Sequence, residues 1–315
     1  MRARVWVAII ICTLGWGTAG IATRAAFRED LGPYTILGLR ALIATAAVFA
    51  YRALRRQPWP SRRLWGLGAM VGLTNYTAPA LLFTLAVQYA SAGVLGLLGA
   101  NSPPVTAVWA HFLLPNEPLN RGKVVGLLLA VAGVGVLIAT GESGLGEGGR
   151  PGLAVLLALA GVVISAFGGV HARMHAPDHD VLDMAGPQLA LGAVVLVPAM
   201  LVIDGLPTGI SAAGWGLIVY MALMGTFVPY LLFFWLLQRV GATTASLPSY
   251  LLPLVALAGG ALILNEQVTA LIGLGGALIL AGVLFTERAD RLPPPAGPGP
   301  EGPPDRLPPQ RDGSR

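Results

Sequence analysis

Long apolar runs separated by short polar stretches repeat along most of the chain. Ten of these runs reach the roughly 17 to 25 residues that a helix needs to cross the hydrocarbon core of a bilayer. They cover residues 5–24, 34–53, 65–88, 92–114, 124–140, 152–172, 183–203, 215–237, 242–264 and 268–286. Each run is continuously apolar, whereas a lipid-facing barrel strand would alternate polar and apolar positions. The pattern therefore predicts an all-α membrane protein with ten transmembrane helices.

One pattern within these runs occurs twice, 150 residues apart. The stretch WGLGAMVGLTNYTAPALLFTLAVQ from Trp65 aligns without a gap with WGLIVYMALMGTFVPYLLFFWLLQ from Trp215, and 9 of 24 positions are identical. With slips of one or two residues in loops, nearly the same offset pairs Arg24 with Arg173, Gly38 with Gly186, Arg40 with Gln188, Pro103 with Pro253, Asn116-Glu117 with Asn265-Glu266, and Gly126 and Gly133 with Gly275 and Gly282. A unit of five helices is odd, so the second copy must enter the membrane from the opposite face. The sequence thus predicts two inverted five-helix repeats, an arrangement typical of alternating-access transporters.

The repeat divides the chain into four predicted segments. Residues 1–140 form the first five-helix repeat, 141–151 an outer linker, and 152–286 the second repeat. Residues 287–315 are too rich in proline for a helix or a core, and are predicted to be a disordered cytoplasmic tail. The first run is expected to be a retained span, because it is about 20 residues long and lacks a convincing signal-peptidase site.

The composition agrees with a membrane protein, since 55% of the residues are apolar and 11% are charged. The net charge of +5 is an orientation signal and does not indicate a nucleic-acid partner. In a ten-pass topology one side carries Arg2, Arg4, Arg52, Arg55, Arg56, Arg62, Arg63, Arg121, Lys123, Arg173 and Arg239. The other side carries Arg24, Arg28 and Arg150. By the positive-inside rule both termini are cytoplasmic, and the preference for Arg over Lys suggests a bacterial plasma membrane.

Several motifs together resemble the drug/metabolite transporter superfamily, EamA type. They are LGWGTAGIATR in the first span, ILGLRALIA in the second, SPPVTAVWAHFLLPNEPLNRGKVVGLLLAVAGVGVL, and its second-half echo LPSYLLPLVALAGGALILNEQVTALIGLGGALILAGVLF. The resemblance covers residues 5 to 286 and implies a ten-helix inverted-repeat fold that moves small metabolites, often amino acids and often outward. The chain departs from the family in carrying PNEP after the fourth span, where a Gly-Glu pair is common.

The charged residues within the spans constrain the substrate. Arg40 lies about six residues into the second span, where an ionised side chain must face protein or water. It is therefore either a substrate contact or a structural lock that binds helix-end carbonyls. No Asp or Glu lies mid-span; Glu117 and Glu266 fall at span ends, where they are expected to cap or bridge turns. The absence of a mid-span carboxylate counts against cationic substrates and favours a neutral, zwitterionic or anionic solute.

Four intraspan prolines are expected to kink their helices around a central cavity. They are Pro79, Pro103, Pro229 and Pro253. The predicted cavity residues are Trp16, Arg40, Asn75, Tyr76, Asn101, Ser102, Trp109, Tyr230, Ser246, Ser249 and Tyr250. Hydroxyls, amides and aromatic rings suit an uncharged or zwitterionic ligand, although small polar residues also join membrane helices without binding a ligand.

Small residues mark one face of the fifth and tenth spans. They are Gly126, Ala130, Gly133, Gly273, Gly276, Ala277 and Gly282. Such faces let helix backbones approach closely, so these helices are expected either to join the two halves or to form a homodimer contact.

Other motifs carry little weight. HARMHAPDHD, from His171, is interrupted by Pro177 and is better explained by capping of the seventh span by Asp180 or Asp183 than by a metal site. No cofactor motif, catalytic motif or metal site is predicted, so an enzyme is not expected. The sequence favours a secondary transporter in the lipid bilayer, and among transporters it favours an exporter. The alternative is a membrane scaffold or receptor that retains the fold.

Overall fold

The computed structural model describes residues 2–114, 117–145, 149–175, 179–240 and 247–290. Over these ranges the chain is helical and contains no strand. The first-half helices are α1 (Arg2–Arg28), α2 (Pro33–Leu54), α3 (Arg62–Val71), α4 (Ala78–Ala86), α5 (Ala92–Gly99), α6 (Ser102–Leu113) and α7 (Arg121–Ala139). The second-half helices are α8 (Pro151–His175), α9 (Val181–Ile203), α10 (Ala212–Ala222), α11 (Val228–Arg239), α13 (Leu247–Leu264) and α14 (Ala270–Asp290).

Within these described ranges, eight helices are long and apolar enough to cross a membrane. Two of the ten predicted spans differ from the rest. The apolar part of α13 is a shorter helix from Pro248 to Leu264. The run 92–114, predicted as one helix, is divided into α5 and α6 at Ala100 and Asn101. The break follows from its sequence, because Pro103 and Pro104 cannot donate the backbone hydrogen bonds that would continue α5 into α6.

Two long spans each contain a π-helical turn at corresponding positions. Gly72–Thr77 joins α3 to α4, and Leu223–Phe227 joins α10 to α11. Pro79 and Pro229 follow these turns directly, at the second position of α4 and of α11. Such turns are frequent at functional sites in helices. The kinks expected at the four prolines remain a prediction.

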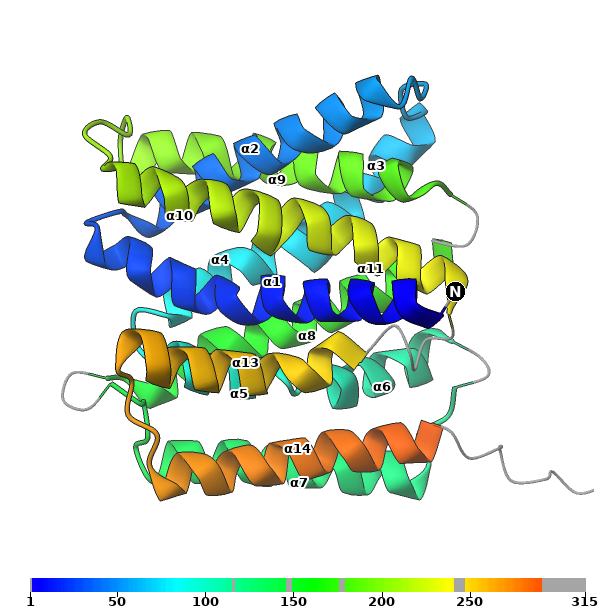
Figure 1. Cartoon of the computed structure of the whole chain (residues 1–315). Helices are drawn as coiled ribbons and strands as arrows, with labels where there is room; N and C mark the ends of the chain where they lie inside the picture. The colour runs from blue at the N-terminus through cyan, green and yellow to red at the C-terminus, as the bar shows by residue number, and fades with distance from the viewer. Residues whose placement is uncertain (1, 115–116, 146–148, 176–178, 241–246, 291–315) are drawn as a thin grey trace, which may run out of the picture.

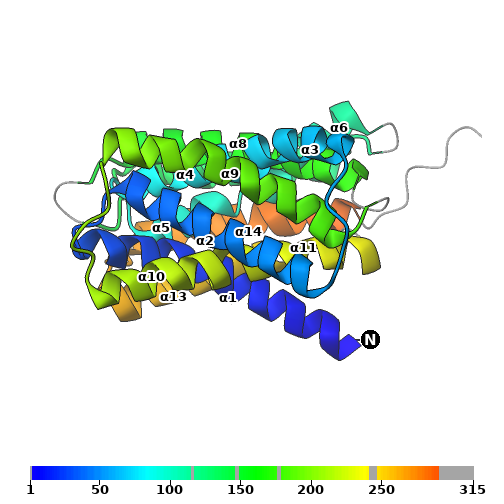
Figure 2. The same ribbon diagram turned by 90° about the horizontal axis from the view of Figure 1, so that it is seen from above.

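The helices form one bundle with nearly parallel or antiparallel axes (Figure 1). The start of α1 and the end of α14 lie at the same end, which we call the N-terminal end; the opposite end is the far end. The pairs α2 and α9, α5 and α13, and α7 and α14 pack against one another. Figure 2 shows the first turns of α1 leaning away from the other helices, where Trp6, Val7 and Ile10 are each at least half exposed.

Helices α7 and α14 pack closely because glycines face one another. A Cβ atom at Gly133 would lie 2.5 Å from the Gly275 carbonyl oxygen, and one at Gly126 would lie 2.5 Å from that of Gly282. Of the predicted small residues, Gly273 has open space around it and Gly276 faces Leu97 on α5 instead. These glycines therefore join the two halves of one chain, as the first alternative expected. A homodimer contact remains a prediction.

The acidic residues at helix ends tie neighbouring segments together. The Asp180 side chain accepts a hydrogen bond from the Leu182 backbone at the start of α9, which confirms the predicted cap. At the start of α2, Asp204 accepts from the Thr35 backbone and hydroxyl.

One predicted segment boundary shifts. The last helix continues to Asp290, so residues 287–290 are helical and do not belong to a disordered tail. Residues 291–315 lie outside the described part of the chain. In the linker, residues 141–145 and 149–150 are described, and the backbone N–H of Ser91 donates to the Ser143 carbonyl at 2.8 Å.

Candidate functional site

A cavity of about 660 Å³ runs between the helices of the two halves. Its central walls come from α1, α2, the π turn Gly72–Thr77, α4, α5, α6, α8, α11 and α13. It continues to the N-terminal end, where Glu117, Lys123 and Arg173 border it. Towards the far end it stops near Val87 and Ala92. The cavity is therefore asymmetric along the bundle axis.

Most of the predicted site residues border this cavity. Those that do are Trp16, Arg40, Asn75, Tyr76, Ser102, Tyr230, Ser249 and Tyr250, with Pro79 and Pro103. They are brought together from six of the predicted spans, separated by up to 234 positions in the chain.

Two of the described predicted residues, Asn101 and Trp109, do not border it. Asn101, at the break between α5 and α6, turns its side-chain amide back to the Leu98 carbonyl at 2.9 Å, and the same carbonyl accepts from the Asn101 backbone N–H at 3.1 Å. Trp109 donates from Nε1 to the Val163 carbonyl at 3.0 Å and packs on Phe167. Ser246 lies outside the described residues. The prolines Pro229 and Pro253 also do not border the cavity.

An aromatic cluster forms one wall. Trp16 lies edge-on to Tyr230 and to Phe233, with ring centroids 5.8 and 5.7 Å apart. Tyr76 is edge-on to Tyr230 at 5.7 Å, and the Tyr230 hydroxyl donates to the Asn75 carbonyl at 2.8 Å. Edge-on packing is a favourable arrangement for aromatic pairs, so the rings of this wall support one another through their mutual contacts.

Arg40 is held at this wall by the other half of the chain. Its Nε donates to the Thr226 hydroxyl at 2.5 Å and one terminal nitrogen donates to the Gly225 carbonyl at 2.9 Å, both in the second π turn. The residue is 8% exposed. Among the described residues no carboxylate lies within 4 Å of its guanidinium, so its positive charge has only neutral acceptors.

Some buried polar atoms near this wall have no protein partner. They are the Tyr76 hydroxyl, the Asn75 side-chain oxygen, the Thr77 hydroxyl and both polar atoms of Gln188. Unpaired buried groups are costly unless water or a ligand satisfies them. Asn75 and Tyr76 border the cavity, so they could hydrogen-bond to what it holds.

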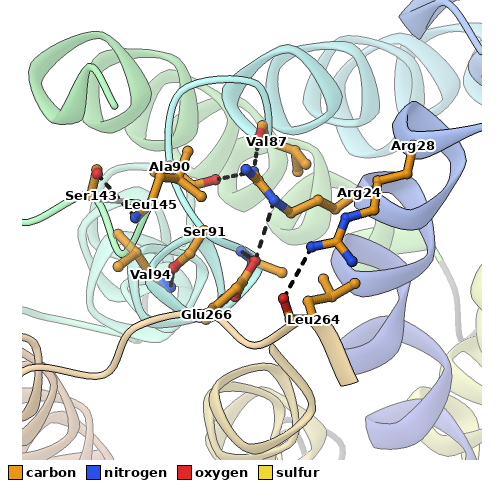
Figure 3. Close-up of polar contacts among 12 residues, drawn as sticks. Arg24, Arg28, Val87, Ala90, Ser91, Val94, Ser143, Leu145, Leu264 and Glu266 are labelled. Carbon is orange, nitrogen blue, oxygen red and sulfur yellow. Dashed lines mark hydrogen bonds and ion pairs between the residues drawn. The ribbon is translucent and has the colours of Figure 1, made fainter. Parts of the chain in front are cut away.

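The far end is closed by a polar network that the sequence did not identify as part of the site (Figure 3). Glu266 accepts hydrogen bonds from the backbone of Ala92 and Gly93 at 2.8 and 3.1 Å, and lies 3.6 Å from Nε of Arg24. Arg24 also donates to the Val87 carbonyl at 2.7 Å. The predicted role of Glu266 in bridging a turn is therefore confirmed, and its partners lie in the other half of the chain.

At the N-terminal end a second ion pair crosses between the halves. Arg173 on α8 donates to Glu117 with an N–O distance of 2.6 Å. The two side chains are 37% and 29% exposed, whereas those of Arg24 and Glu266 are 21% and 5% exposed. The contact at the N-terminal end is thus more exposed than the one at the far end.

Comparison with known proteins gives a consistent result. The model of the EamA-like transporter family matches residues 4–139 and 152–288. The uncharacterized transporter YoaV of Bacillus subtilis is 27% identical over 90% of this chain and 96% of its own length. The uncharacterized inner membrane transporter YedA of Escherichia coli K12 is 26% identical over 86% of this chain and 87% of its own. A protein of known crystal structure is 19% identical, with a TM-score of 0.64 over 92% of this chain and 99% of that one, and so shares the fold.

Proposed function

The chain belongs to the EamA-like transporter family, and from this and the cavity we propose that it is a secondary transporter that exports a small metabolite. The family and the transporters similar to this chain point away from an enzyme. The observation that carries the proposal is the cavity, which is large enough for a metabolite and is lined by aromatic, hydroxyl and amide groups from both halves.

We propose that the halves are inverted five-helix repeats. Five predicted passes lead from the start of α1 to the end of α7, so α8 begins at the far end while α1 begins at the N-terminal end (Figure 1). The helix contacts support this symmetry. Helix α1 packs on α11 and α13, and its counterpart α8 packs on α4 and on α5 and α6, the counterparts of α11 and α13. Exchanging the halves therefore maps one set of contacts onto the other.

The proposed mechanism is alternating access, in which each half moves against the other around a central site. The cavity extends to the N-terminal end and stops at the network on the far end, which is the asymmetry expected of one conformation of such a cycle. The charge distribution supports a cytoplasmic N-terminal end, because most basic residues lie there. The present conformation would then face the cytoplasm, ready to receive a solute for export.

The site favours a neutral, zwitterionic or anionic solute over a cation. Arg40 places a positive charge at the wall, and no carboxylate compensates it among the described residues. The aromatic rings of Trp16, Tyr230 and Phe233 offer an apolar surface beside it. An amino acid fits both features, because its carboxylate could face Arg40 while its side chain packs on the rings.

An unbiased comparison of metabolites inside and outside cells, with and without the protein, tests this function and would identify the solute. We expect at least one amino acid or small organic acid to accumulate outside expressing cells. Unchanged profiles in both compartments, despite folded protein in the membrane, would favour a scaffold or receptor that retains the fold.

A further inference from the structure

Two ion pairs link the halves of the bundle in a reciprocal manner. At the far end an arginine of the first half, Arg24, meets Glu266 of the second. At the N-terminal end an arginine of the second half, Arg173, meets Glu117 of the first. The two arginines correspond to each other in the sequence repeat, and so do the two glutamates. The same kind of contact is therefore present at both ends of the bundle.

We propose that the two ion pairs are the alternating closures of this cavity: each is buried when its own end is shut, and becomes exposed to water and able to separate when that end opens. The proposal rests on the transport cycle proposed above and names the residues that set which end is open. In the present conformation Arg24–Glu266 is the more buried pair, and Arg173–Glu117 is the more exposed pair although its N–O distance is the shorter.

The differing environments of the pairs support this assignment. Glu266 is almost fully buried, and the cavity does not reach it. Glu117 and Arg173 are each more than a quarter exposed and border the cavity directly. Exposed ion pairs contribute little to stability because water competes for both charges. The pair at the N-terminal end can therefore separate at low cost, whereas the far pair must first be hydrated.

Glu266 binds more than its arginine, which explains how the far end stays shut. Its two oxygens accept from the first backbone N–H groups of α5, where an anion is also favoured by the helix dipole. Next to it, Arg28 donates to the Leu264 carbonyl at 3.0 Å. Figure 3 shows these contacts drawing α1, the start of α5 and the segment after α13 together. A small separation of the halves would break all of them at once.

The test measures access to the cavity from each side. A single cysteine replaces Ser102, which borders the middle of the cavity, in a Cys12→Ser background. A membrane-impermeant maleimide is then applied to either face of proteoliposomes of known orientation. Glu266→Gln should raise the labelling rate from the far side about five-fold or more, a typical size for a conformational coupling. Glu117→Gln should lower it or leave it unchanged and raise labelling from the N-terminal side.

Matched variants separate a closure from a general loss of structure. Glu142→Gln changes an acidic residue outside the network at the far end and should leave both rates unchanged. Arg24→Gln leaves the hydrogen bonds between Glu266 and the start of α5 in place but removes the ion pair. It should shift the labelling rate in the same direction as Glu266→Gln, by a smaller factor. This variant also serves if Glu266→Gln does not fold. Shifts in the same direction for Glu266→Gln and Glu117→Gln, or no shift in Glu266→Gln and Arg24→Gln, would overturn the proposal.

Charge exchange gives a sharper expectation, because the two ends differ. Exchanging the N-terminal pair, as Glu117→Arg with Arg173→Glu, should restore the wild-type rates. Exchanging the far pair, as Arg24→Glu with Glu266→Arg, should not restore the wild-type rates, because an arginine cannot accept hydrogen bonds from the backbone N–H groups of α5. Full restoration at the far end would contradict the role given to those backbone bonds. Labelling is measured without any solute, so it tests the closures even if no transport is found. Active transport with an unshifted labelling rate would reject the closures but not the proposed transport function.

Discussion

The guanidinium of Arg40 on α2 is hydrogen-bonded to the hydroxyl of Thr226, which lies in the π turn of the other half. The Thr226 hydroxyl in turn donates to the Met221 carbonyl at 3.0 Å. The pairing agrees with the expected structural lock, and because Arg40 also borders the cavity, its contact with a substrate stays a prediction. Because its repeat counterpart is Gln188, the positive charge is present on one side of the site only.

Substitution of Arg40 tests its role in charge selection. Arg40→Gln should abolish a preference for a carboxylate over the corresponding amide, measured by competition with 3-phenylpropionate and 3-phenylpropanamide for uptake of the transported solute. Arg40→Lys keeps the charge and should keep part of the preference. Arg63→Gln, an exposed arginine outside the cavity, is the control. An unchanged preference in Arg40→Gln would make the residue a structural lock alone.

The same substitution should also weaken the fold. Loss of hydrogen bonds from a charged donor typically costs about 1.5–3 kcal/mol, so Arg40→Gln should unfold at a lower temperature in detergent. Thr226→Val removes only the hydroxyl acceptor and should have a smaller effect on stability. If neither variant unfolds earlier than wild type, the contact between α2 and the π turn does not stabilise the bundle.

Two glycines on α7 should respond oppositely to the same change. A Cβ at Gly135 meets nothing within 4 Å, so Gly135→Ala should stabilise the helix by about 0.5–1 kcal/mol. A Cβ at Gly133 would press on the Gly275 carbonyl and on Ile279, so Gly133→Ala should destabilise by about 1–3 kcal/mol. Thermal unfolding of both variants in one detergent measures the difference. Equal effects would show that α7 and α14 do not depend on this close approach.

The inverted arrangement predicts opposite sides for two exposed positions. Gln88 follows α4, and Arg239 is the last residue of α11, which is the helix that corresponds to α4 in the repeat. Single cysteines at these positions, in a Cys12→Ser background, should be labelled from opposite faces of the membrane in intact cells and in inverted vesicles. Labelling of both from one face would show that the halves are parallel.

Trp16 should contribute to solute binding through the aromatic wall. Trp16→Ala removes the ring that contacts Tyr230 and Phe233, and should raise the KM for the exported solute about ten-fold with the protein still folded. Trp59 is 73% exposed and does not border the cavity, so Trp59→Ala is the control. A KM unchanged by Trp16→Ala would place the solute elsewhere in the cavity.

The sequence predicted much of the helical framework because the length of an apolar run is a direct physical requirement of the bilayer. It did not predict the π turns, since Gly72–Thr77 and Leu223–Phe227 lie inside long apolar runs, and the polar residues within a run do not by themselves indicate a change of helix type. The break at Asn101 was missed for the same reason, although the adjacent Pro103 and Pro104 were a usable signal.

The site was harder to predict than the spans. Trp109 faces α8 instead of the cavity because each helical residue turns about 100°, and a run of hydropathy does not fix that rotation. The reciprocal ion pairs could not be assigned either. The repeat identified Arg24 with Arg173 and Glu117 with Glu266, but which arginine meets which glutamate depends on how the halves dock.

Solute flux through the purified protein in proteoliposomes tests the central claim most directly. The account predicts saturable movement of at least one amino acid or small organic acid above the rate of protein-free vesicles, with Trp16→Ala slower and Trp59→Ala unchanged at low solute concentration. Flux at the protein-free rate across a broad panel of amino acids and metabolites, with the protein correctly folded and inserted, would contradict it.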